Sequence, residues 1–100
     1  MKEELYFLQD LFNTIQKKAK SKDKKSYTRK LLKSGKNTIA QKVSEESSEL
    51  IIDYLNGSKK RTVEEASDLI YHIFVLLHSK NIKLEDIKKE LKSRRNVRQK

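Results

Sequence analysis

Acidic residues gather in two short stretches of this sequence, at spacings that place them together on a helix. The first stretch reads Glu45-Glu46-Ser47-Ser48-Glu49 and the second reads Glu65-Ala66-Ser67-Asp68. Residues three or four positions apart share one helix face, so each stretch would present its carboxylates side by side. Carboxylate oxygens suit Mg²⁺, which usually also keeps water and substrate phosphates as ligands. The pattern therefore points to metal-assisted hydrolysis of a phosphoanhydride, with a spare carboxylate to orient or deprotonate water.

A solvated helix surface is the alternative interpretation, because 38% of the residues are charged. Two observations favour a metal site over a solvated surface. Glu46 and Glu49 border an apolar stripe on their helix, as Glu65 and Asp68 do on theirs, so antiparallel packing of the two helices would bring four carboxylates together. Carboxylates that converge beside a core repel each other, and a bound cation removes that repulsion. Glu65 also has a second explanation, as the partner of Thr62 in a helix-capping box.

The spacing of apolar residues predicts about five helices that would hold these carboxylates. The expected helices are residues 3–19, a short segment from Ser26 to Gly35, residues 37–56 with a left-handed cap at Asn56-Gly57, residues 62–79 with an end at Asn81, and a last helix around residues 84–91. The chain has no Pro and only two Gly, a composition that favours uninterrupted helices. We expect one all-α domain over residues 1–100, with a frayed basic tail at 91–100.

Composition limits the cellular location of the protein and the kinds of chemistry and partner it can have. The chain has no Cys, which excludes disulfides, thiolate nucleophiles and Cys-ligated zinc and favours the cytoplasm. Its apolar runs are too short to cross a bilayer, and the acidic N-terminus is unlike a signal peptide. A formal charge of +10 attracts polyanions but does not choose among nucleotides, nucleic acid and lipid headgroups. A chain of 100 residues buries little of its surface, so dimerisation would help it.

The order E-E-x-x-E followed by E-x-x-D is similar to that of the all-α, MazG-like nucleoside triphosphate pyrophosphohydrolases. The flanking residues narrow the resemblance to the phosphoribosyl-ATP pyrophosphatases of histidine biosynthesis. They are Ser26-Tyr27-Thr28-Arg29-Lys30-Leu31-Leu32, Gly35, Ile39-Ala40-Gln41-Lys42-Val43 and Asp68-Leu69-Ile70-Tyr71-His72. The resemblance runs from about residue 5 to residue 95. It departs at Ser44 and Ser47, where the family commonly has Gly and Ala.

The resemblance implies hydrolysis of phosphoribosyl-ATP to phosphoribosyl-AMP and pyrophosphate, with Mg²⁺ as cofactor. The implied metal ligands are Glu46, Glu49, Glu65 and Asp68, the implied catalytic residues are Glu45, Glu46 and Glu49, and the implied substrate-binding residues are Ser26, Thr28, Lys30 and Lys42. Glu45 would either join the ligands or position water. A MazG-like helical bundle completed by a second copy is the implied assembly, and without cysteines the chain would be a stand-alone form.

Two aromatic positions have two possible roles each. Tyr27 either packs in the core, which we favour, or stacks on the substrate base. His72 is either a partner of the Asp68 carboxylate or a buried structural histidine.

Two other functions fit the same residues. The nearest is a house-cleaning enzyme of this fold that acts on a dNTP or a modified nucleotide. The other is a non-catalytic, basic helical module that binds nucleic acid, with an affinity that falls steeply in salt. We expect a nucleotide as the substrate, with neither nucleic acid nor membrane as a partner.

Overall fold

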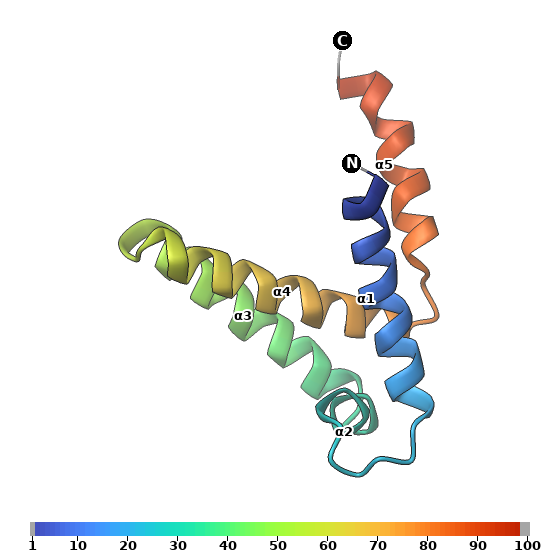
Figure 1. Ribbon diagram of the computed structural model, residues 1–100. Helices are drawn as coiled ribbons and strands as arrows, with labels where there is room; N and C mark the ends of the chain where they lie inside the picture. Colours follow the sequence, from blue (N-terminus) through green and yellow to red (C-terminus); the bar gives the residue numbers. More distant parts are fainter. Residues whose placement is uncertain (1, 99–100) are drawn as a thin grey trace.

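The computed structural model describes residues 2–98, and the side chains of residues 6–95 within that range. The helices are α1 (Lys2–Lys20), α2 (Tyr27–Lys33), α3 (Lys36–Asn56), α4 (Lys59–Ser79) and α5 (Leu84–Arg98). Figure 1 shows α3 and α4 as an antiparallel pair, with α1 and α2 against the end of the pair that lies away from the α3–α4 turn. Over the described residues the fold is all-α, as the sequence predicts.

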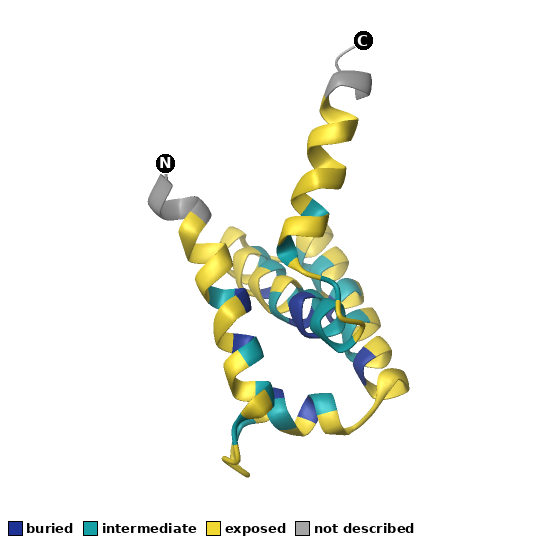
Figure 2. Ribbon diagram, turned by 90° about the vertical axis from the view of Figure 1, so that its right-hand side faces the viewer, coloured by how far each residue is buried: buried dark blue, intermediate teal, exposed yellow. Residues whose placement is uncertain are grey.

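The core lies where α1 and α2 meet the α3–α4 pair (Figure 2). Its buried apolar residues are Phe12, Ile15, Leu31, Ile39, Phe74 and Val75, drawn from all four of these helices. Phe12 and Phe74 meet edge to face, with ring centroids 5.4 Å apart and an interplanar angle of 66°, a favoured aromatic arrangement. This contact fixes α1 against α4.

Local capping signals begin α2 and end α4 at the predicted residues. The Ser26 side chain caps α2 by accepting a hydrogen bond from the Arg29 backbone N–H (3.2 Å). After α4, Asn81 adopts a left-handed conformation with φ of 61°, and the Ile82 N–H donates to the Leu77 carbonyl at 2.9 Å. This is the Schellman arrangement that closes a helix.

The turn between α3 and α4 differs from the expectation in two respects. The capping residue of α4 is Ser58, whose side chain accepts from the Arg61 N–H, so Thr62 lies inside the helix and Glu65 has no capping role. Gly57 is extended, with φ of −98° and ψ of −178°, so the predicted left-handed cap is wrong. A Cβ at Gly57 would lie 2.9 Å from the Asp53 carbonyl oxygen, which makes close approach, and not positive φ, the reason for glycine.

Helix α5 continues through the segment predicted to be frayed, as far as Arg98, and residues 99–100 lie outside the described part. It projects from the α3–α4 pair and is mostly exposed (Figure 2). Among the described residues no helix has the length and apolar character needed to span a membrane.

Candidate active site

Three of the predicted carboxylates converge between α3 and α4. Glu46 and Glu49 come from α3 and Glu65 comes from α4, and each offers an oxygen within 4.8 Å of the other two. The antiparallel packing of the two helices brings them together, because each acidic stretch borders the apolar face through which its helix packs. Glu46 and Glu65 are buried, and Glu49 is exposed.

Two oxygens of this cluster lack a partner. Glu46 Oε2 and Glu65 Oε2 are buried and make no hydrogen bond to the described protein atoms. A buried polar atom without a partner is costly, and more so when it is charged. An all-oxygen donor set with two unpartnered carboxylate oxygens fits a hard dication such as Mg²⁺.

The electrostatics of the cluster also reflect crowding of negative charge. Burial raises the pKa of Glu65, the neighbouring Glu49 raises it further, and Arg61 acts in the opposite direction. Lys42 lies on the other side of the site, 3.6 Å from Glu45 and 3.7 Å from Glu46. Partial burial disfavours its charged form, but Tyr27, Glu45 and Glu46 outweigh burial and hold the pKa of Lys42 above its ordinary value.

The remaining predicted carboxylates lie at the edge of the cluster. Asp68 is exposed, one turn after Glu65 on α4, close enough to raise the pKa of Glu65 but outside the set of three converging oxygens. Glu45 is exposed and accepts a hydrogen bond from Gln41 Nε2 at 3.0 Å. Its carboxylate is therefore accessible to water while Lys42 holds it near the cluster.

The four predicted substrate-binding residues occupy different environments. Lys42 borders the carboxylates, and Lys30 is exposed on α2. The Ser26 hydroxyl is used in capping α2. Thr28 is only 1% exposed, and its hydroxyl bonds to that of Tyr71. Its burial gives no surface to a phosphate in this structure, so a substrate contact by Thr28 stays a prediction.

An aromatic cluster joins α2 to α4 beside Lys42. The Tyr27 hydroxyl lies 2.9 Å from His72 Nε2, and His72 Nδ1 lies 2.7 Å from the Asp68 backbone oxygen. Since a carbonyl only accepts, Nδ1 carries a proton, and a neutral His72 accepts from Tyr27. His72 thus meets the backbone of Asp68, as a buried structural histidine would. Tyr27 stacks on Tyr71 but is 49% exposed, which differs from a core position.

The predicted site residues do not include Arg61 and Asp53, which also lie at this site. Arg61 Nη2 donates to Glu65 Oε1 at 2.6 Å and lies 3.8 Å from Asp53 Oδ2. The expected helix begins at residue 62 and leaves Arg61 outside it, yet Arg61 lies in the first turn of α4. Its position four residues before Glu65, on the same helix face, is the signal that could have found it.

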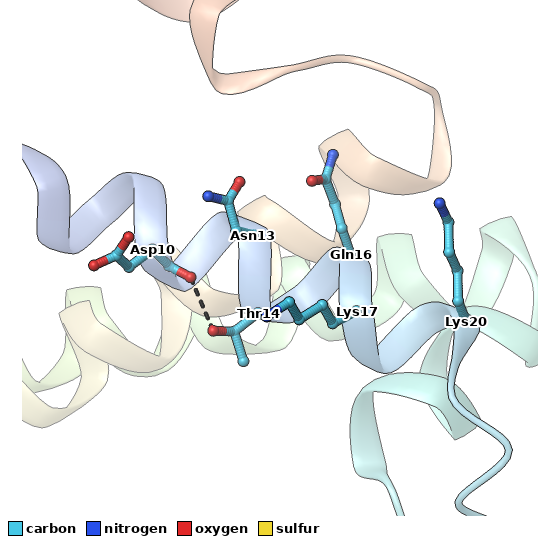
Figure 3. A pocket seen from close by; sticks show the side chains of 6 residues that line it. All are labelled: Asp10, Asn13, Thr14, Gln16, Lys17 and Lys20. Atoms are coloured by element: carbon cyan, nitrogen blue, oxygen red, sulfur yellow. Dashed lines mark hydrogen bonds between the residues drawn. The ribbon is translucent and has the colours of Figure 1, made fainter.

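Two hollows of the surface lie elsewhere. One of about 540 Å³ lies on α1 and is shown in Figure 3; its lining residues are Asp10, Asn13, Thr14, Gln16, Lys17 and Lys20. A second, of about 770 Å³, is lined by residues of α1 and α5. Neither contains a residue of the carboxylate cluster, so the chemistry of the donor atoms, and not the depth of a pocket, identifies the site.

Similarity to known proteins extends over α3 and α4, the two helices that carry the site. A profile of the family "Phosphoribosyl-ATP pyrophosphohydrolase" matches residues 8–95. The phosphoribosyl-ATP pyrophosphatase of Sulfolobus acidocaldarius is 48% identical over 84% of this chain and 88% of its own length. That of Bacillus cytotoxicus is 44% identical over 87% of this chain and 81% of its own length. The "Histidine biosynthesis bifunctional protein HisIE" of Bacteroides thetaiotaomicron is 45% identical over 92% of this chain, which spans 45% of that protein.

Proposed function

The chain belongs to the phosphoribosyl-ATP pyrophosphohydrolase family, and from this premise we propose that it hydrolyses phosphoribosyl-ATP in histidine biosynthesis. Water adds to the α-phosphorus, the α–β anhydride bond breaks, and phosphoribosyl-AMP and pyrophosphate leave. The structural observation that carries the proposal is the convergence of three carboxylates with two unpartnered buried oxygens. The cytoplasm stays the predicted location.

Glu46, Glu49 and Glu65 would hold Mg²⁺, and Asp68, one turn from Glu65, would complete the set. When bound, the ion neutralises phosphate oxygens and lowers the pKa of a bound water. Glu45 would take the proton of the attacking water, because its carboxylate is exposed and is held near the cluster by Lys42. A carboxylate within reach of water is a suitable general base.

Lys42 and Lys30 are the cations that we assign to the substrate phosphates. Lys42 is charged, partly exposed and adjacent to Glu46, so it can meet phosphate oxygens next to the carboxylates. Ser26 shapes the start of α2 through its cap. Ser26 and Thr28 both remain proposed contacts of the substrate.

Substrate profiling tests the proposal. Purified protein is given phosphoribosyl-ATP and, separately, a panel of NTPs and dNTPs, with Mg²⁺ or with a chelator, and released pyrophosphate is measured. We expect metal-dependent release from phosphoribosyl-ATP above all others. Preference for a dNTP would favour the house-cleaning alternative, and no release from any nucleotide would contradict enzymatic function and favour the nucleic-acid-binding module.

Metal affinity should fall on acidification, and earlier than for ordinary glutamates. The raised pKa of Glu65 means that its carboxyl keeps a proton to higher pH, and a metal ion must displace that proton. Affinity is therefore full above this pKa and is lost as the pH falls through it. Calorimetric titration with Mn²⁺ from neutral to mildly acidic pH measures the loss. A flat affinity over that range would contradict the expectation.

A homodimer completes the proposal. Large apolar side chains remain exposed along the α3–α4 pair, namely Ile51, Ile52, Tyr54, Leu55, Val63 and Ile70. Large apolar side chains exposed on one helix pair favour an interface there, and the buried core is small. Sedimentation equilibrium should give twice the mass of 11.8 kDa, and a monomeric mass at micromolar concentration would contradict it.

A further inference from the structure

Arg61 bonds to a carboxylate, that of Glu65, which a metal ion at the proposed site would also bind. Its guanidinium donates to Glu65 Oε1 at 2.6 Å and to Glu64 Oε1 at 2.9 Å, and it lies 3.8 Å from Asp53 Oδ2. Glu65 also belongs to the three converging carboxylates and has its other oxygen buried without a partner. One carboxylate thus serves the arginine and the proposed metal site.

The position of Arg61 in the fold is electrostatically unfavourable without these carboxylates. It lies in the first turn of α4, together with Lys59 and Lys60 and with no acidic residue. The positive end of the helix dipole repels cations there. The contacts with Glu65, Glu64 and Asp53 offset that repulsion.

The backbone of Arg61 is fixed, but its side chain is not enclosed. Its N–H donates to the Ser58 side chain at 3.1 Å, and the N–H of the next residue, Thr62, donates to the Ser58 carbonyl at 3.0 Å. The side chain itself is 55% exposed. The guanidinium can therefore leave Glu65 and turn to water without any rearrangement of the core.

We propose that Arg61 is an internal counter-ion of Glu65 that a divalent cation displaces, so that this arginine weakens metal binding and stabilises the metal-free protein. The inference rests on the proposed metal site. Arg61 compensates Glu65 when the metal is absent and yields its place when the metal binds. It is a positioning residue and does not itself take part in the hydrolysis.

Calorimetric titration of the chelator-treated full chain with Mn²⁺ tests the proposal at fixed pH and ionic strength. Arg61→Gln should tighten Mn²⁺ binding by about 3- to 10-fold, the range that loss of a competing charge-assisted hydrogen bond would give. The same variant should have a lower melting temperature in chelator and a larger metal-induced rise in melting temperature, because binding to the folded state adds to stability.

Two control variants separate displacement from general charge effects. Lys60→Gln removes the same charge one residue away, and Arg94→Gln breaks a comparable pair with Glu90 (2.7 Å) on α5. Both should bind Mn²⁺ as the unaltered chain does. Equal affinity of Arg61→Gln and the unaltered chain, weaker binding by Arg61→Gln, or equal tightening by Lys60→Gln would each overturn the role of Arg61 and leave the proposed function intact. No Mn²⁺ binding by the unaltered chain would overturn the metal site itself.

Discussion

Replacement of Glu49 by glutamine should lower the rate of pyrophosphate release by about 100-fold or more, because loss of even an outer-shell partner of a metal typically costs 10- to 100-fold. The amide keeps the size of the side chain but removes a negative charge from the converging oxygens. Glu49 is exposed, so its replacement should leave helix content unchanged. The measurement is steady-state release at saturating Mg²⁺, with circular dichroism of the same sample.

Glu90→Gln is the matched control for Glu49→Gln. Glu90 is also an exposed helical glutamate, but it pairs with Arg94 on α5 and lies outside the cluster. Its variant should release pyrophosphate at the unaltered rate. A fully active Glu49→Gln variant would remove Glu49 from the proposed metal ligands.

Phe12→Ala should have the largest effect on stability. Phe12 is 1% exposed and packs edge to face on Phe74, and removal of a buried Phe side chain costs about 3–5 kcal/mol of unfolding free energy. That is a large part of the roughly 5–15 kcal/mol that stabilises a domain of this kind. Chemical denaturation should therefore show a strongly lowered midpoint, or a chain that is unfolded before denaturant is added.

Phe7→Ala provides the comparison on the same helix. Phe7 is 65% exposed, and surface substitutions usually change stability by less than about 0.5 kcal/mol. A loss from Phe7→Ala equal to that from Phe12→Ala would mean that the exposed end of α1 is buried in solution.

Most of the fold could be predicted, because its signals are local. Apolar spacing predicted the helices, Ser26 was identified as the start of α2, and Asn81 as the end of α4. The convergence of Glu46, Glu49 and Glu65 followed from their position beside the apolar faces of two adjacent helices. Their role as metal ligands stays a prediction.

The turn between α3 and α4 was predicted only in part, because the Ser58 cap is a local signal but the ion pair of Arg61 with Asp53 joins the two helices. Thr62 and Glu65 have the spacing of a capping box, and this placed the predicted start of α4 at Thr62. The structure begins the helix at Lys59, where Arg61 is compensated by Asp53 of the preceding helix. Gly57 likewise owes its place to the nearby Asp53 carbonyl, which the sequence alone does not show.

The turn between α3 and α4 is short, and this determines whether the chain can accept an insertion there. Only Gly57 and Ser58 separate α3 from α4, so the turn fixes the offset between the two helices. Lengthening a surface loop usually costs little. Here an inserted residue would shift Glu65 along α4 relative to Glu46 and Glu49, and the donor oxygens would no longer meet. This connection is therefore intolerant of insertions, although it lies at the exposed tip of the hairpin, where length variation is ordinarily accepted.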